Sequence, residues 1–468
     1  MNTARAKRTI CLLLAAAVMC AAAAACDEND APSDGTSTGS EASSESGKDV
    51  TDTDEPEITV TDEEGIPADI YDQMTTVYDS VPEQERENSF NTDEVMQRYG
   101  FSQLNKYEKQ VYLELLDGFK NFETTIQVSQ KLQPYELQRV KSLLMTEDYS
   151  LYYLNNEYSI YRNMANGFAS SVEVAYTHSP TEINVIDLET ERAATRLIQQ
   201  LQPTMNNYDV VKYFHDYLIL NCTYDEAAEY NHMAYGALVD GKAVCEGYAK
   251  AFAYLCDRVG IENLLVTGMS ADKHMWNMVK IDGEWYHIDV TQDDLNKELL
   301  NDLILYEYFL ANDKIVKSHM TIDTDLYVPP VSNGTRYYYF NRENTYITGL
   351  SDIDSKVKST FIRASKAKQS YVQFKFSSDE LNDVGTDLLL DDLIEGREGS
   401  MHRLLSEVNS ETGMSIISVA SFQMKSYRLL IFRINYPITP AAQTTQTSAP
   451  AVTSAETADT SAASAPAA

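Results

Sequence analysis

The dipeptide Asp282-Gly283 lies between two runs with the composition of β-strands, residues 274–281 and 284–290. Asp-Gly is the signal for a two-residue turn between antiparallel strands, so the sequence predicts a hairpin here. Such a turn sets the register of the whole hairpin, because it makes Ile281 oppose Glu284 and thereby fixes every pair beyond them. No other feature constrains the fold of this chain as strongly.

The predicted register brings five chemically distinctive side chains to one face of the hairpin, because side chains alternate in direction along a strand. They are His274, Trp276, Trp285, His287 and Asp289. His274 and Asp289 are diagonal neighbours, within reach for a carboxylate to hold an imidazole. Trp276 and Trp285 are the two tryptophans of the whole chain. We expect both to wall a site here and to limit the access of water.

A cysteine stands at the start of a predicted helix upstream of the hairpin. The pattern predicts a helix over about 245–259, with Gly260 placed as its terminator. At the first turn, the free N–H groups and the helix dipole favour the thiolate of Cys245. A cysteine nucleophile needs a base, and the base needs an orienting group. His274 and Asp289 fit those two roles.

The other cysteines do not predict a disulfide framework or a metal site. Cys222, Cys245 and Cys256 are the three in the globular part, and an odd number leaves at least one thiol unpaired within the chain. A zinc site is the alternative interpretation, but Cys245 and Cys256 lie eleven residues apart and no pair has the short spacing of zinc ligands. We therefore expect no metal and no cofactor, and we interpret Cys222 and Cys256 as structural.

Three blocks of sequence around these residues resemble the bacterial transglutaminase-like superfamily. They are 243–249 (AVCEGYA), 274–279 (HMWNMV) and 283–291 (GEWYHIDVT), and Tyr224-Asp225 and 234–238 (AYGAL) match the family's common lead-in. The resemblance covers about 205–315. It implies a papain-like α+β fold in which Cys245 is the nucleophile, His274 the general base and acid, and Asp289 the orienting group. Gln292 departs from the family's usual Trp, a change expected to reshape the pocket and to leave the triad intact.

Three aromatic residues are our candidates for substrate binding. Trp276 and Trp285 come from the hairpin, and Tyr235 comes from the lead-in block.

The N-terminal segment has the layout of an export signal. Three basic residues precede an uncharged run of 17 residues that ends in small residues and Cys26, and the chain then turns acidic. The run is short for a spanning helix of roughly 20 residues. It resembles a bacterial lipoprotein signal in which Cys26 is lipidated, although Ala23 stands where such signals usually carry Leu. Cleavage near Ala25 with free secretion and a retained membrane helix are the alternatives.

Composition divides the rest of the chain into further segments. Residues 27–66 carry 14 acidic groups and one basic group with few large apolar residues, which predicts a flexible tether. We expect a helical N-terminal domain at 67–204, a catalytic domain at 205–325 and a small α+β domain at 326–437. The Ala-, Thr- and Ser-rich tail 438–468 is predicted to be disordered.

The net charge of the chain limits the kinds of partner that it can bind. The net charge of −34 repels phosphate backbones, so nucleic-acid binding is excluded. The expected function is that of an extracytoplasmic enzyme, anchored to the outer face of the membrane only by lipid, which acts on amide bonds of cell-surface proteins or peptides through a thioester. Hydrolysis and cross-linking both remain open, as does the oligomeric state. The alternative is a surface binding module in which the triad is silent and the papain-like fold serves as a scaffold.

Overall fold

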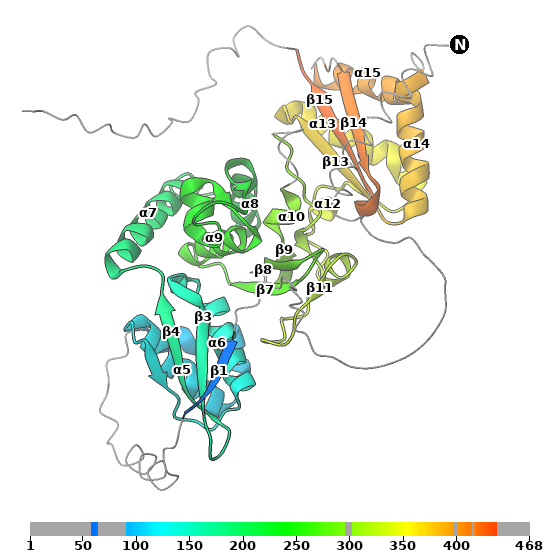
Figure 1. The fold of residues 1–468 in the computed structure, drawn as a ribbon. Coiled ribbons are helices and arrows are strands. Elements are labelled where there is room, and N and C mark those ends of the chain that lie inside the picture. The colour runs from blue at the N-terminus through cyan, green and yellow to red at the C-terminus, as the bar shows by residue number, and fades with distance from the viewer. Residues whose placement is uncertain are drawn as a thin grey trace, which may run out of the picture. The chain divides into compact units, whose positions relative to one another are not determined.

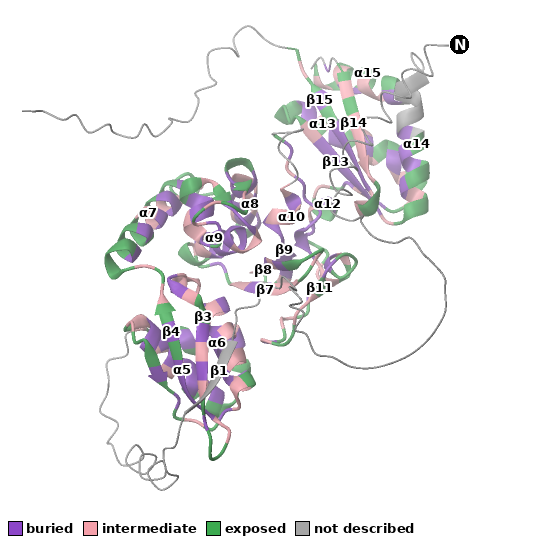
Figure 2. Cartoon of the chain, in the orientation of Figure 1, coloured by how far each residue is buried: buried purple, intermediate pink, exposed green. Residues whose placement is uncertain are grey.

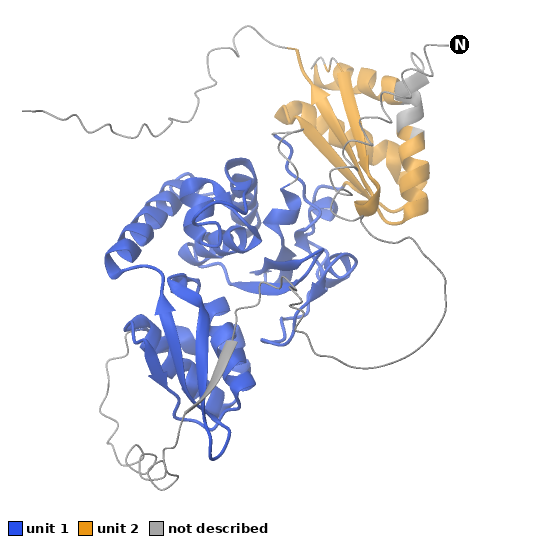
Figure 3. Cartoon of the chain, in the orientation of Figure 1, with its two compact units in different colours: residues 1–344 blue, residues 345–468 orange. Residues whose placement is uncertain are grey.

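The computed structural model describes residues 58–63, 90–294, 302–395, 400–413, 416 and 418–437 (Figure 1). The chain divides into two compact units, unit 1 with residues 1–344 and unit 2 with residues 345–468 (Figure 3). The predicted signal with Cys26, most of the predicted tether and the tail 438–468 lie outside the described residues. Among the helices that the structure describes, none has the length and apolar character needed to cross a membrane.

The first part of unit 1 is an α/β domain built on a four-stranded sheet of order β1-β3-β4-β2. Its strands are β1 (Ile58–Glu63), β2 (Thr125–Gln127), β3 (Leu154–Asn163) and β4 (Ala169–Tyr176). Its helices are α3 (Thr92–Met96), α4 (Tyr99–Gln103), α5 (Lys106–Lys120), α6 (Pro134–Glu147), the 3-10 helix η1 (Tyr149–Leu151) and α7 (Pro180–Ile198). The prediction of a helical domain at 67–204 was therefore wrong in leaving out the sheet.

The sheet also corrects the prediction for the tether. Residues 58–63 are not part of a flexible segment, because they pair with β3 in parallel. All four residues from Ile58 to Thr61 are β-branched, and such residues favour strands. Within β3 and β4 the buried residues include Ile160 and Val172, which oppose each other across the pair.

Two helices of this domain begin with residues typical of helix starts. Asn105 caps α5, its side chain accepts from the backbone N–H of Glu108, and the Glu108 carboxylate accepts in return from the N–H of Asn105 at 2.9 Å. Pro134 is the first residue of α6, where its missing N–H costs no hydrogen bond. The apolar stripes of both helices are buried in the domain core.

The second part of unit 1 packs helices on a five-stranded sheet of order β10-β9-β8-β7-β11, and β5 pairs with β6 separately. The strands are β5 (Thr223–Tyr224), β6 (Lys242–Ala243), β7 (Asn263–Met269), β8 (Lys273–Ile281), β9 (Glu284–Ile288), β10 (Phe309–Ala311) and β11 (Thr321–Ile322). The helices are α8 (Asn207–Asn221), the π-helix η2 (Gly236–Asp240), α9 (Cys245–Arg258), α10 (Val290–Asp293), α11 (Asp313–Val316) and α12 (Tyr339–Arg342). Buried residues gather along α9 and β8, which pack together (Figure 2).

The hairpin of β8 and β9 has the predicted turn and register. Asp282 and Gly283 both have positive φ, 51° and 86°, as a turn matched to the twist of the strands requires. Ile281 opposes Glu284, and the pairing continues to Asn277 opposite Ile288. The strand then ends, so Asp289 lies directly beyond the last pair.

The boundary between the units lies after residue 344, so the prediction of a domain boundary at 325/326 was wrong. Residues 326–344 belong to unit 1 because their side chains bond to its sheet. The Tyr327 hydroxyl donates to the carbonyl oxygen of Leu265 at 2.6 Å, and Ser332 Oγ donates to the carbonyl oxygen of Trp285 at 2.7 Å.

Unit 2 is a small α+β domain with a four-stranded sheet of order β12-β13-β15-β14. Its strands are β12 (Tyr346–Ile347), β13 (Tyr371–Phe376), β14 (Ser418–Met424) and β15 (Leu429–Asn435). Its helices are the 3-10 helices η3 (Leu350–Asp352) and η4 (Lys425–Tyr427), α13 (Ile353–Ala367), α14 (Asp379–Glu395) and α15 (Ser400–Thr412). Its core has its own apolar residues, among them Phe361, Phe374 and Phe432.

Candidate active site

Cys245 is the first residue of α9, as predicted, and is partly exposed to solvent. The start of this helix is held by a close backbone approach. A Cβ atom on Gly247 would lie 2.2 Å from the carbonyl oxygen of Asn231, so glycine is required there. The Asn231 side chain in turn donates to the carbonyl oxygen of Glu226 at 2.8 Å. The loop before η2 therefore fixes the position of the thiol at the positive end of a helix dipole.

His274 and Asp289 form the predicted pair. Nε2 of His274 lies 2.6 Å from Oδ2 of Asp289, and both side chains are buried. The second carboxylate oxygen is also used, because Asp289 caps α10 and its Oδ1 accepts from the backbone N–H of Gln292 at 3.0 Å. With both oxygens bonded, the carboxylate can rotate little. The capping bond therefore fixes the orientation of the Asp289 carboxylate, and the carboxylate in turn orients the imidazole of His274.

His274 also forms a hydrogen bond with Cys245, and because Nε2 faces Asp289, Nδ1 is the nitrogen left for the thiol. Burial disfavours the charged imidazole, but the charge and hydrogen bond of Asp289, together with a hydrogen bond and charge interaction with Cys245, outweigh it. They raise the pKa of His274 from 6.5 to about 10. At neutral pH the ring therefore carries a positive charge, beside a sulfur that can hold a negative one. This is the arrangement of an activated cysteine nucleophile.

The comparison with protein families covers this part of the chain. Residues 195–290 match the family model described as Transglutaminase-like superfamily, and the match includes Cys245, His274 and Asp289. This part of the chain is a transglutaminase-like domain. The α+β class expected from the resemblance is confirmed. No curated protein matches the sequence.

Solved structures similar to the chain include three whose alignments cover only part of each chain. A crystal structure of a TGase is 19% identical with a TM-score of 0.21, and the alignment covers 34% of this chain and 48% of that one. A Cytophaga hutchinsonii protein whose structure is described as a candidate cysteine protease is 18% identical with a TM-score of 0.20, over 27% and 52%. Menin, described with its binding site for the Mixed Lineage Leukemia (MLL) protein, is 12% identical with a TM-score of 0.22, over 50% and 52%. The chain spans about half the length of each of these proteins.

In the transglutaminase-like domain, Trp276 lies against the imidazole of His274. Its ring stacks on His274 with centroids 5.8 Å apart and planes at 20°, and it is almost fully buried. The indole N–H donates to Nδ1 of His287 at 3.0 Å, and Nε2 of His287 lies 3.0 Å from Oδ1 of Asp313. Because Nδ1 of His287 accepts, Nε2 carries the proton donated to Asp313. The predicted position of Trp276 beside His274 is thus the one observed.

Trp285 is not placed beside the triad, so its prediction as a wall of the site was wrong. Its ring meets Tyr99 of the first domain edge-on, with centroids 6.2 Å apart, and the Lys280 ammonium lies 5.7 Å from the ring centroid. In the register, Trp285 opposes Lys280, four residues along β8 from Trp276. At about 3.3 Å per residue this is roughly 13 Å. Two side chains on one face of a hairpin need not share a site.

Tyr235 also has partners away from the triad. Its hydroxyl donates to Glu189 Oε2 at 2.8 Å, and its ring meets that of Tyr230. It lines a small cavity with residues of α7 and η1, among them Ile186 and Tyr149. The described contacts of Tyr235 therefore give no support to a role in substrate binding.

Tyr224, which the sequence analysis did not propose as a site residue, lies at the rim of the site. It pairs with Ala243 across β5 and β6, two residues before Cys245, and about half of its surface is exposed. Partial burial, and then the charge of Cys245, raise the pKa of the Tyr224 phenol. The sequence signal that could have identified Tyr224 is its place in the block Tyr224-Asp225, which matches the family's common lead-in.

Cys222 and Cys256 are buried and form no disulfide within the described residues, and burial raises the pKa of Cys256 well above its ordinary value. Within the ranges that the structure describes, no group of three or more His, Cys, Asp or Glu side chains is arranged to hold a metal ion.

Proposed function

We propose that this chain is an exported cysteine enzyme that acts on amide bonds of proteins or peptides through a thioester. The observation that supports this most directly is the position of His274, between the carboxylate of Asp289 and the thiol of Cys245 at the start of α9. A charged imidazole beside a helix-terminal cysteine favours the thiolate, which is the nucleophilic form.

In the first step the thiolate of Cys245 attacks the carbonyl carbon of the amide. A C–S bond forms, and the carbonyl oxygen becomes an oxyanion within reach of the backbone N–H of Cys245. The C–N bond then breaks, and the amine leaves with the proton that His274 carries on Nδ1. The products of this step are a thioester, a neutral imidazole and a free amine.

In the second step the neutral imidazole takes a proton from an incoming nucleophile, which attacks the thioester. The C–S bond breaks, the thiolate and the imidazolium are restored, and the acyl group leaves on the nucleophile. Water as the nucleophile gives hydrolysis, whereas a primary amine such as a lysine side chain gives a cross-link. The triad serves both outcomes equally.

The proposal is tested with a pool of synthetic peptides and a fluorescent primary amine. Mass spectrometry distinguishes hydrolysis, seen as new acids or chain ends, from transfer, seen as covalent tagging. We expect one of the two with the wild type and neither with Cys245→Ala. Products that persist in Cys245→Ala would remove Cys245 from the chemistry.

A wild type without activity would favour a binding module that uses the fold as a scaffold, since the superfamily includes inactive members. In that case Cys245→Ala should leave the binding of surface proteins unchanged. The presence of all three triad members, in contact, supports the enzyme instead, since a scaffold has no need of them.

We also propose that Cys26 is lipidated and holds the enzyme on the outer face of the cytoplasmic membrane. The basic start, the short apolar run and the small residues before Cys26 support this. Fractionation of wild type and Cys26→Ser tests it, with the variant expected in the soluble fraction. Equal amounts of both in the membrane pellet would contradict lipidation.

A further inference from the structure

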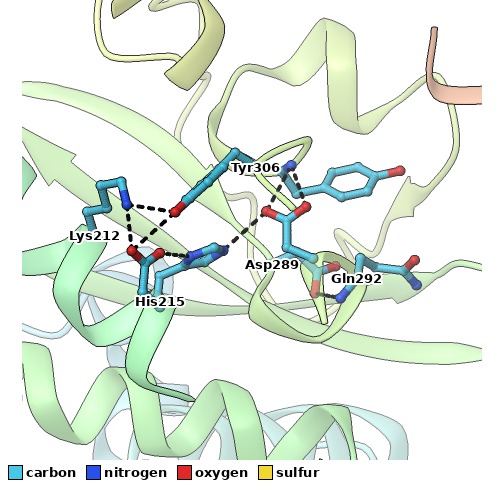
Figure 4. A network of polar contacts seen from close by, with 8 residues as sticks. Lys212, His215, Asp289, Gln292 and Tyr306 are labelled. Atoms are coloured by element: carbon cyan, nitrogen blue, oxygen red, sulfur yellow. Dashed lines mark hydrogen bonds and ion pairs between the residues drawn. The ribbon is translucent and has the colours of Figure 1, made fainter. Parts of the chain in front are cut away.

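A second buried histidine, His215 of α8, lies between two carboxylates (Figure 4). Its Nδ1 is 3.0 Å from Oδ1 of Asp216, its Nε2 is 3.2 Å from Oδ2 of Asp293, and its ring has no exposed surface. The Asp293 carboxylate also accepts from the backbone N–H of Tyr308, at 3.1 and 3.2 Å to its two oxygens. None of these contacts involves Cys245, and the network has no part in the two chemical steps above.

The network is connected to the triad through α10. This helix is a single turn, capped by Asp289 at its start and ending at Asp293, whose N–H donates to the carbonyl oxygen of Asp289 at 3.2 Å. A single turn is not stable on its own, so its position depends on the groups that anchor it. At its end His215 and the backbone N–H of Tyr308 hold the Asp293 carboxylate. The N–H of Leu305 donates to the carbonyl oxygen of Asp293, and the Tyr248 hydroxyl donates to Asp294 at 2.6 Å. An anchor on Asp293 therefore also restrains Asp289, four residues earlier.

The charges of the network are balanced. Burial opposes a charge on His215, but the hydrogen bonds and charges of Asp216 and Asp293 outweigh it and raise the pKa of the ring. Lys212 Nζ donates to the Tyr306 hydroxyl at 2.7 Å and pairs with Asp216, so Lys212 and His215 face the two carboxylates. Burial, and to a lesser extent the charge of Asp289, raise the pKa of Asp293. The hydrogen bond and the charge of His215 act in the opposite direction and lower the pKa of Asp293.

We propose that His215 and Asp293 are positioning residues for the base, which act on His274 through α10 and Asp289. The proposal rests on the proposed function, because it assigns them a role in the same site. A role in stability alone does not call for such a network, since apolar side chains of similar volume often replace buried ion pairs without loss. The network matters for the site because Asp293 lies at the end of α10, the helix that Asp289 caps at its start.

The test uses the rate at which iodoacetamide alkylates Cys245 as a function of pH, which requires no identified substrate. The full chain is used, and the profile of Cys245→Ala is subtracted to remove reaction at other thiols. A charged imidazole beside a thiol favours the thiolate, which is the form that iodoacetamide alkylates. With Asp289→Asn we expect the rise in rate to move to higher pH.

Two variants address the network itself. His215→Phe keeps a ring of similar size against Tyr306 and removes both polar contacts, and Asp293→Asn keeps an acceptor for Tyr308 and removes the charge. For both we expect a shift in the direction of Asp289→Asn of about one pH unit, or about tenfold in rate at pH 7. His215→Gln retains a donor for Asp293, and its profile should lie between those of His215→Phe and the wild type.

A matched control separates positioning from stability. Tyr112→Phe breaks a buried network of the first domain, where the Tyr112 hydroxyl donates to Glu147 at 3.1 Å and accepts from Arg98. It should lower the thermal midpoint, measured by circular dichroism, without moving the alkylation profile. If His215→Phe does not fold, Asp293→Asn, which is nearly isosteric, decides the question.

The outcomes also distinguish this inference from the proposed function. Wild-type profiles in folded His215→Phe and Asp293→Asn, together with a shifted profile in Asp289→Asn, would overturn the inference and leave the triad in place. A wild-type profile that does not respond to His274→Ala would instead overturn the proposed function, and the inference with it.

Discussion

The histidine–carboxylate pairs at the two ends of α10 use the same groups and differ in what the second ring nitrogen meets. In the first pair, His274 has Asp289 on one side and Cys245 on the other. In the second pair, His215 has Asp293 on one side and Asp216 on the other. The first ring can therefore pass a proton to a reacting group, whereas both nitrogens of the second ring face carboxylates.

The two pairs also differ in how far solvent can reach them. Cys245 is partly exposed, so a substrate can reach the sulfur beside the first pair. The second pair is 0% exposed at both side chains. A buried histidine–aspartate pair is thus insufficient evidence of catalysis, because the same pair also serves as an anchor. The decisive features are a nucleophile at the free nitrogen and a path to it.

The largest effect should separate the two histidines by activity. Cys245→Ala and His274→Ala should each reduce kcat by up to about 10⁶-fold, since nucleophile and base act as a unit in such sites. His215→Phe should cost roughly tenfold, because it changes only the position of the base. The measurement is turnover of a peptide found in the pool experiment. Equal losses for His274→Ala and a folded His215→Phe would mean that both rings enter the chemistry.

The next largest effect concerns the two carboxylates. Asp289→Asn should lower kcat by as much as about 10⁴-fold, the loss seen when this change imposes the wrong tautomer on a serine-protease histidine. KM should change little, since the carboxylate is buried and does not face the substrate. Asp293→Asn is the matched change at the other end of α10, with an expected loss of about tenfold. Near-normal turnover in Asp289→Asn would contradict the orienting role of Asp289.

The pH dependence gives the third difference. The pKa of His274 is raised from 6.5 to about 10, so its contribution to stability is complete below about pH 6.5 and is lost as the pH rises through about 10. In Asp289→Asn, His274 stays buried but loses the carboxylate charge that favours its charged form. The difference in free energy of unfolding between wild type and variant should therefore shrink as the pH rises from about 6.5 to about 10. Denaturation followed by tryptophan fluorescence measures it, because both tryptophans lie in the hairpin. A difference that grows with pH would contradict the assigned shift.

The hairpin and the triad could be predicted because their determinants are local. Asp282-Gly283 sets the register through its own φ angles, and that register brings His274 near Asp289. The start of α9 follows from a helical pattern that begins at Cys245. In each case a few neighbouring residues decide the structure, so no knowledge of the rest of the chain is needed.

The features that were missed depend on contacts between distant segments. His215 lies 78 residues from Asp293, and the sequence signal is only a histidine on the apolar stripe of α8 between Val211 and Leu218. The sheet of the first domain pairs β1 with β3, and the paired residues lie 100 residues apart in the sequence. Sequence periodicity predicts single elements, and it does not indicate which distant element completes them.

The smallest effect tests a third pair, His287–Asp313, which contacts neither the thiol nor α10 in the described bonds. It holds the indole N–H of Trp276, whose ring stacks on His274. Trp276→Phe keeps an aromatic ring there but leaves Nδ1 of His287 without its donor, at a cost of about 1–3 kcal/mol in the free energy of unfolding. We expect kcat to fall less than tenfold, because the ring limits the motion of His274 and takes no part in bond making.

Trp285→Phe is the matched control for this change, since it makes the same substitution in the same hairpin. Its ring packs on Tyr99 of the first domain, roughly 13 Å from Trp276 along the strand. Turnover of this variant should therefore equal that of the wild type. If Trp285→Phe reduced kcat as much as Trp276→Phe, the effect would come from the stability of the hairpin as a whole. The stacking of one indole on the base would then have no separate role.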